Sequence, residues 1–143
     1  IYTGEDTLSL HDALPILDGS MSAREHYDLA KQLKPLRDEN ILILSSGNVV
    51  HNLRTVHWQD DAQPYLWAKD FNEFFAAQLD AKHHDPLIEW QKYGEAAHLS
   101  IPTPEHYWPA LYTLALQDED ERASIFVDGI KMSSISMLGF SVQ

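Results

Sequence analysis

The sequence predicts an α/β domain with a mainly parallel central sheet flanked by helices, in the form of a three-layer domain truncated at one edge. Two observations predict this class. Residues 41–44 form a short, continuous apolar run between polar and turn-forming residues, which is typical of a strand buried on both faces. A helical pattern precedes this run, and helices that alternate with buried strands indicate a parallel sheet.

The first helix is expected from Ser22, with Ser20 or Ser22 as its N-cap and Pro35 in its last turn. Its apolar residues are spaced to form one buried stripe: Tyr27, Leu29, Ala30, Leu33 and Leu36. A turn follows the 41–44 strand, and residues 49–55 begin a short helix.

Further helices are expected at residues 65–79, where five apolar side chains share one face, at 86–93 and at 106–116. Asp85 is expected to cap the 86–93 helix and Gly94 to end it. Residues 96–101 are expected to be irregular and residues 118–121 to form a solvated acidic loop. The last expected elements are two strands, at 124–127 and 134–142, which are joined through Asp128-Gly129.

The amino-acid composition narrows the classes of partner and of metal site that this protein can have. The 143 residues include 10 Lys and Arg against 22 Asp and Glu, giving a net charge of −12 without a basic run, so nucleic acid and anionic membranes are excluded as partners. No apolar run approaches the roughly 20 residues that cross a bilayer. The absence of cysteine excludes thiolate zinc sites and fits a reducing cytoplasm. Any metal must be held by Asp, Glu or the eight histidines.

Residues 1–16 show neither helical nor strand periodicity. Within them, residues 7–16 (TLSLHDALPI) look like one reading frame of a common sequencing-library adapter. We therefore expect a non-native leader at 1–16 and the domain proper at 17–143. The alternative is a natural N-terminal arm.

Two histidines stand out because each follows a motif that shapes the backbone. His51 lies beyond Gly47 at the carboxyl end of the predicted strand, where open α/β sheets bind ligands. His106 and its neighbour Glu105 follow the stiff sequence Pro-Thr-Pro. From the residues alone, each histidine is either a site residue or a structural one that caps a helix or fills the core.

Four motifs, in this order, resemble the bacterial 4,5-DOPA extradiol dioxygenases, which belong to the class III extradiol ring-cleaving superfamily. The motifs are SSGNVVHNLRTVHW (45–58), PYLWAKDFNEFF (64–75), IPTPEHYWPALY (101–112) and GIKMSSISMLGF (129–140). The resemblance covers residues 17–142, about the C-terminal half of a family member. The other half carries Gly-His-Gly-Ser-Pro and Ser-Ala-His-Trp motifs, which supply two ligand histidines and do not occur in this sequence.

The resemblance implies roles for three residues. His51 matches the histidine of the S-G-N-x-x-H-N motif, which lies at the metal centre and is the candidate acid/base. His106 matches the histidine of the P-T-P-E-H motif and is the favoured metal ligand over its neighbour Glu105. The implied cofactor is Fe(II), whose open positions admit a catechol and O2 together, while Zn(II) can occupy such a site in purified protein without supporting oxygen chemistry.

The expected function is thus that of the C-terminal part of a non-haem extradiol dioxygenase acting on DOPA or a related catechol. With two ligand histidines absent, we expect residues 1–143 alone to be inactive and to expose apolar sheet surface. The main alternative is a non-enzymatic binding or interaction module with structural histidines. A hydrolase using Ser46 and His51 is a third, and it lacks a G-x-S-x-G nucleophile elbow.

Overall fold

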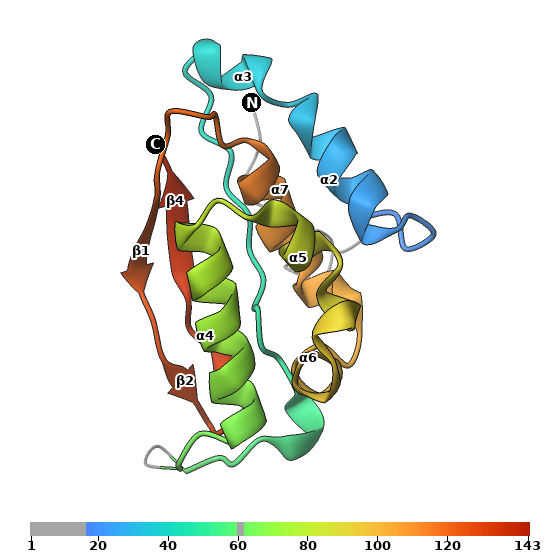
Figure 1. Ribbon diagram of the computed structural model, residues 1–143, viewed down its shortest axis with the longest axis vertical. Coiled ribbons are helices and arrows are strands. Elements are labelled where there is room, and N and C mark those ends of the chain that lie inside the picture. The colour runs from blue at the N-terminus through green and yellow to red at the C-terminus, as the bar shows by residue number, and fades with distance from the viewer. Residues whose placement is uncertain (1–16, 60–61) are drawn as a thin grey trace, which may run out of the picture.

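A computed structural model describes residues 17–59 and 62–143, so the expected leader at 1–16 lies outside the described residues. Figure 1 shows a layer of helices beside a small antiparallel hairpin. Helix α4 (Leu66–Asp80) covers the hairpin of β1 (Ala123–Val127) and β4 (Gly139–Val142). On its other side lie α2 (Ala23–Lys31), α5 (His84–Ile88), α6 (Glu95–Ser100) and α7 (Trp108–Ala115).

The first helix confirms its predicted cap but is shorter than predicted. The Ser22 hydroxyl accepts a hydrogen bond from the Glu25 amide, and the Glu25 carboxylate accepts one from the Ser22 amide, which completes a capping box. The helix ends at Lys31, and Pro35 begins a separate short helix, α3 (Pro35–Asp38), because proline is favoured at a helix start. Leu29, predicted as buried, is 42% exposed.

Helices α4 and α7 supply the centre of the core. The predicted aromatic face of α4 is confirmed: Phe71, Phe75 and Leu79 are fully or almost fully buried. The rings of Phe71 and Phe75 lie against that of the buried Tyr107, which directly precedes α7, and Leu111 of α7 belongs to the same buried cluster. Each such side chain contributes about 1.5–3 kcal/mol when it is taken from water.

The segment between these helices differs from the prediction. Helix α5 begins at His84, two residues before the predicted start, and is followed by the 3-10 turns η3 (Trp90–Tyr93). Gly94, at φ +99°, ends this stretch as predicted. Residues 96–101 were predicted to be irregular, but residues 95–100 form α6 and bury Ala97 and Ser100. Two further 3-10 turns are η2 (Leu53–Thr55) and η4 (Pro104–His106).

The strands pair only antiparallel within the described residues. Strand β1 pairs with β4, and β2 (Ile130–Lys131) pairs with β3 (Ile135–Ser136). The predicted strand at 41–44 is wrong for this structure: the segment is extended but unpaired, and Leu42 and Leu44 are each 86% exposed. A strand needs neighbours along its edges, and the described residues place none beside it. The expected parallel central sheet is therefore not seen.

The acidic cluster is only partly the solvated loop that was expected. Glu121 pairs with Arg37, and Asp118 pairs with Lys34, so this loop is tied to α3 and to the residue that precedes it. Within residues 17–59 and 62–143, no helix combines the length and the apolar character that crossing a bilayer requires.

Candidate functional site

His51 lies in the interior, between α6 and the β2–β3 hairpin. Its backbone forms an isolated antiparallel bridge with Ile135, and its amide donates to the carbonyl of Ser100 at 2.9 Å. The preceding Val49 and Val50 are buried in the core, and His51 itself is only 5% exposed. These backbone contacts alone therefore fix where the His51 ring lies.

Two asparagines of the same motif hold the loop on both sides of His51. The Asn48 side-chain amide donates to the carbonyl of Ser136 at 2.8 Å, and that of Asn52 donates to the carbonyl of Leu99 at 2.8 Å. The Ser134 hydroxyl donates to the carbonyl of Asn52 at 2.9 Å. The sequence did not predict these positioning roles, although both asparagines belong to the SSGNVVHN motif that contains His51.

His106 comes to the same place from the other side. It ends η4, and its carbonyl accepts a hydrogen bond from the Asn48 amide at 2.8 Å. The rings of His51 and His106 lie with their centroids 5.2 Å apart and their planes inclined by 61°. The structure thus brings together the two histidines that the sequence singled out.

Gly47 makes this approach possible. A Cβ atom at Gly47 would lie 2.2 Å from the carbonyl oxygen of His106 and 3.1 Å from a ring carbon of Pro109. Such a distance is far inside van der Waals contact, so only glycine lets the two segments pass this closely. Gly47 therefore serves a close backbone contact between the two segments, in addition to lying in the turn that the sequence predicts after residues 41–44.

The pKa of His51 is shifted by competing effects. Burial lowers the pKa of His51 below its ordinary value, hydrogen bonds to the carbonyls of Thr103 and Asn48 raise it, and the neighbouring imidazole of His106 lowers it; the net direction is downward. Nε2 lies 2.7 Å from the Thr103 carbonyl oxygen and Nδ1 3.0 Å from that of Asn48. A neutral imidazole donates only one proton, so it satisfies one of these two acceptors at a time.

Glu105 adds a carboxylate at the edge of this pair. The Thr103 hydroxyl donates to Glu105 Oε1 at 2.6 Å. Burial acts to raise the pKa of Glu105. The hydrogen bond from Thr103, the backbone amide of Glu105 and the two histidines lower this pKa by more than burial raises it, so the net shift is downward. The carboxylate therefore stays ionised beside the two rings, where negative charge favours a bound cation.

Three of the described side chains, those of His51, His106 and Glu105, are of a kind that could serve as metal ligands. Two imidazoles with a neighbouring carboxylate are the nitrogen and oxygen donors that a ferrous site uses. Within residues 17–59 and 62–143, however, no group of three or more His, Asp or Glu side chains is arranged to hold a metal ion. Neither nitrogen of His51 contacts Ser46, which is exposed, so the Ser/His pair of the hydrolase alternative is not formed.

Comparison with known families gives a match over most of the chain. Residues 14–138 match the family described as the catalytic LigB subunit of aromatic ring-opening dioxygenase. A 4,5-DOPA dioxygenase extradiol of Escherichia coli (strain K12) is 45% identical over 129 residues, which are 88% of this chain and 47% of that protein. The protein of the same name from Portulaca grandiflora is 30% identical over 107 residues, covering 73% of this chain and 39% of that protein.

A solved structure agrees with the fold. The crystal structure of an uncharacterized protein from Escherichia coli K12 superposes with a TM-score of 0.80 at 46% sequence identity, covering 87% of this chain and 52% of that one. The chain spans about half the length of the curated relatives that it matches.

Proposed function

This chain belongs to the family of the catalytic LigB subunit of aromatic ring-opening dioxygenases, and we propose that it supplies two site histidines to a non-haem extradiol dioxygenase acting on DOPA or a related catechol. The observation that carries the proposal is the convergence of His51 and His106, with rings 5.2 Å apart, from segments that only the fold brings together. The names of the relatives support the substrate class, since they are 4,5-DOPA dioxygenases.

His106 is the residue that would hold the metal during turnover, with Glu105 as the neighbouring carboxylate, and His51 lies beside it at the metal centre. A neutral imidazole has one lone pair, so His51 would either ligate the metal or accept a proton, and the proton-transfer role is proposed for the ring that is not bound to metal. Fe(II) held by these residues would supply the open coordination positions and the redox chemistry that the reaction of a catechol with O2 requires. Zn(II) fits the same donors but has no redox chemistry, so a zinc-loaded protein would not cleave the ring. The remaining ligands would come from polypeptide corresponding to the part of the relatives that this chain does not match.

The work of His51 is proton transfer. Its lowered pKa leaves the imidazole neutral near pH 7, which is the form able to accept a proton from a catechol hydroxyl. The same proton returns to the product as the ring opens to a muconic-semialdehyde-type aldehyde. General acid–base help of this kind is typically worth about 10²- to 10⁴-fold in rate.

The chain by itself holds too few ligands for this chemistry. We therefore expect no ring cleavage by residues 1–143 alone with Fe(II) and O2.

The cysteine-free composition supports a reducing cytoplasm as the site of action. The foreign origin of residues 1–16 is tested by the source DNA: a continuous homologous reading frame upstream of these codons would show that they are natural.

The experiment that tests the function uses a chimaera. Residues 17–143 replace the matching segment of the Escherichia coli relative, which is 45% identical to them. The chimaera, loaded with Fe(II), should convert DOPA to a product followed by its visible absorbance. His51→Gln should reduce kcat by about 10²-fold or more, and His106→Ala should reduce bound iron. His83→Ala, a change at an exposed histidine, serves as the control.

One observation favours the second candidate, a binding module with structural histidines. Both ring nitrogens of His51 are occupied by backbone carbonyls, as in a histidine that only ties loops together. If the chimaera folds but neither binds iron nor cleaves DOPA, this second function is correct. If it cleaves DOPA and His51→Gln leaves kcat unchanged, only the proton-transfer role of His51 is wrong.

A further inference from the structure

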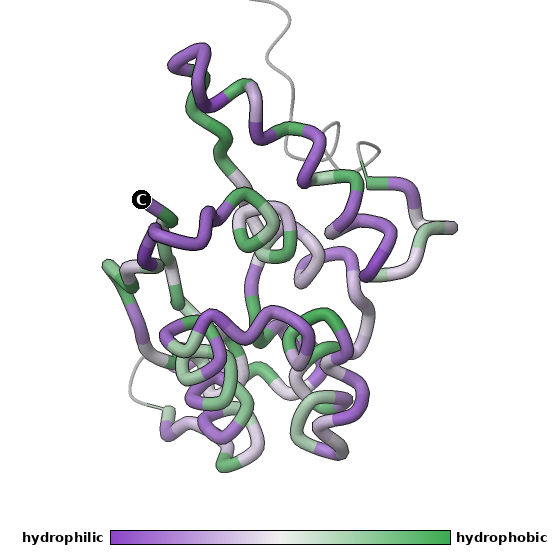
Figure 2. Tube along the Cα trace, turned by 45° about the horizontal axis from the view of Figure 1, so that its top comes forward, coloured by the Kyte–Doolittle hydropathy of each residue, from purple (hydrophilic) through white to green (hydrophobic). Residues whose placement is uncertain are grey.

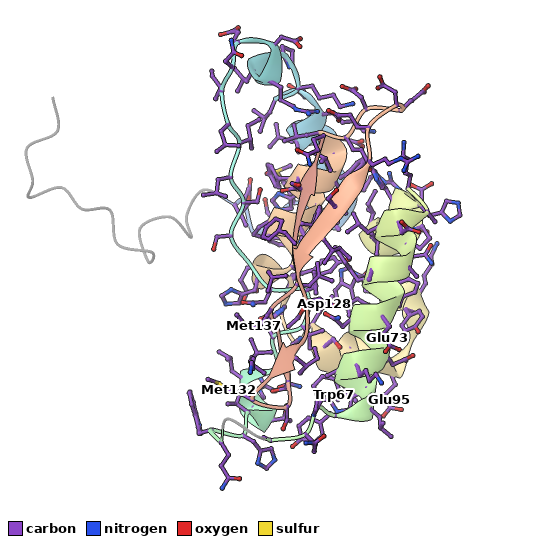
Figure 3. The ribbon with its side chains drawn as sticks, turned by 90° about the vertical axis from the view of Figure 1, so that its left-hand side faces the viewer. Trp67, Glu73, Glu95, Asp128, Met132 and Met137 are labelled. Carbon is purple, nitrogen blue, oxygen red and sulfur yellow. The ribbon has the colours of Figure 1, made fainter. Side chains whose placement is uncertain are left out.

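The structure contains an open groove of about 540 Å³ away from the two histidines. One wall is the extended segment 41–45 and the opposite wall is β4; Pro109 and Thr113 of α7 also line it. In Figures 1 and 3 the extended segment leaves α3 and runs beside the hairpin without joining it. Figure 2 shows the first residues of this segment as a hydrophobic stretch of the trace.

The first wall is a strand without a neighbour. The Ile41 amide donates to the Leu36 carbonyl and the Asn48 amide to that of His106. Among the described residues, the amides between these two points donate to no backbone carbonyl. Ile41 is 45% exposed, and Leu42 and Leu44 are each 86% exposed. Apolar side chains and open peptide groups at the same place are what an edge presents before another strand pairs with it.

The second wall is also an open edge. Within the described residues β4 pairs with β1 alone, so its other side has no strand partner. Residues 138–142 of this strand and its approach line the groove. The volume alone would suit a small ligand. Two unpaired backbone edges and mostly aliphatic walls fit an extended chain better, because an extended chain satisfies both edges with main-chain hydrogen bonds.

The length of the relatives indicates what fills the groove. The chain matches 47% of the Escherichia coli relative and 52% of the chain in the solved structure, so about half of each lies outside the match. We propose that the groove between residues 41–45 and β4 accepts an apolar β-strand from polypeptide corresponding to that unmatched half. A strand that pairs with either wall lies about 4.8 Å from it, and pairing with both would join the walls into one sheet.

Charge disfavours a second copy of this chain as the occupant. Each copy carries a net charge of −12, so two copies repel each other. Among the described residues that line the groove, only Arg37 carries a guanidinium, and it is already paired with Glu121 and donates to the Leu116 carbonyl at 2.6 Å. An uncharged strand therefore fits the groove better than an acidic segment.

The groove is tied to the candidate site by the chain itself. The extended segment continues through Gly47 and Asn48 into His51. Pairing along residues 41–45 would therefore hold the loop that carries His51 from its N-terminal side. The pairing involves no catechol or metal, so its failure and the failure of the proposed ring cleavage give different results.

The experiment uses the unmatched half of the Escherichia coli relative as a separate polypeptide, co-expressed with this chain. We expect a 1:1 complex in which hydrogen exchange of the amides at 42–46 and 139–142 slows at least tenfold relative to the chain alone. Leu42→Lys and Leu44→Lys should each weaken the complex at least tenfold. Leu66→Lys is the matched control, because Leu66 is also 86% exposed but lies on α4, outside the groove.

Four results would overturn the proposal: no complex, a complex without protection at 42–46, equal weakening by Leu66→Lys, or concentration-dependent protection of the groove in the chain alone, which would identify a second copy. The isolated chain gives an independent check. Leu42→Lys should leave its urea midpoint unchanged, because the leucine contacts solvent. A large fall in that midpoint would mean that the groove is closed and would reject the proposal.

Discussion

Nε2 of His51 lies 2.7 Å from the carbonyl oxygen of Thr103, two residues before the carboxylate of Glu105. Because a carbonyl oxygen only accepts hydrogen bonds, the contact is formed when Nε2 carries the proton, and that nitrogen then has no lone pair for a metal or for a substrate proton. The contact also joins the SSGNVVHN loop directly to the PTPEH segment, so any ligand that takes Nε2 must change both segments together. The relationship gives the site a measurable response to metal even in the absence of turnover.

The first prediction concerns metal binding. Addition of Zn(II) to the isolated chain should shift the ring signals of His51 and the carbonyl carbon signal of Thr103 along the same titration curve, measured by NMR. His106→Ala should weaken this binding at least about tenfold, because it removes one of the two imidazoles. His83→Ala should have no effect; equal losses in the two variants would show that the zinc is bound elsewhere.

The second prediction concerns Gly47. Gly47→Ala places a methyl group 2.2 Å from the His106 carbonyl oxygen, so the backbone contact must open and the Asn48–His106 hydrogen bond must lengthen. We expect a loss of about 1–3 kcal/mol in the free energy of unfolding, measured with urea. The matched control is Gly19→Ala, where nothing lies within 4 Å of the added carbon and the change should stay within about 0.5 kcal/mol.

The third prediction concerns the buried side chain of Asn72 in α4. Its amide nitrogen donates to Asp128 at 2.8 Å, and its oxygen accepts from the Ser136 hydroxyl; Figure 3 labels Asp128 where β1 ends. Asn72→Asp keeps the shape but sets two carboxylates against each other, so we expect a loss of about 1–3 kcal/mol at pH 7.

Acid should reverse this effect. Burial and the neighbouring carboxylate raise the pKa of the new group in the folded state, so the loss relative to wild type is largest at neutral pH and shrinks as the pH falls through that raised value. Urea unfolding at several pH values measures the difference. Adding Asp128→Asn should restore most of the stability at pH 7; failure to do so would contradict the assigned hydrogen bond.

The fourth prediction concerns the ion pair that ties the acidic loop to α3. Hydrogen bonding to Arg37 lowers the pKa of Glu121 from 4.5 to about 2. A carboxylate with a lowered pKa stabilises the fold above its unfolded-state value, and this contribution disappears as the pH falls from about 4.5 to about 2. The side chains are 26% and 18% exposed, so water screens the pair in part, and we expect about 1–2 kcal/mol.

Glu121→Gln should therefore lower the free energy of unfolding at pH 7 and bring it close to the wild-type value near pH 2. Urea titrations at fixed ionic strength measure both values. Glu119→Gln, a change at an exposed position in the same loop, is the control. An equal effect of the two changes at pH 7 would show that general charge, and not this pair, is responsible.

The sequence predicted correctly those helices that carry strong local signals. The cap at Ser22 and the aromatic face of α4 are properties of a few neighbouring residues, and both are confirmed. Helix α6 was missed because it is only six residues long and lacks a side-chain cap. The strand at 41–44 was predicted from its apolar run, but a strand also requires partners, which a local pattern does not contain.

The same distinction applies to the candidate site. Motifs identified His51 and His106, and the structure places their rings together. The carbonyls of Asn48 and Thr103 and the amide of Asn52 could not be assigned, because their roles depend on backbone positions brought together only by folding. The strongest available signal was their presence in the same short motifs as the histidines.

The hydrogen bonds around His51 join residues that are far apart in the chain. Asn48 is bound to a residue 88 positions later, Asn52 to one 82 positions later, and the His51 ring to one 52 positions later. During synthesis, His51 therefore leaves the ribosome long before most of its anchors exist. Contacts of such long range form slowly and late in folding. The loop thus acquires its final geometry only when residues 134–136 have been made and have docked, so ribosomal stalling before that point would leave a chain with helices but without this histidine pair in place.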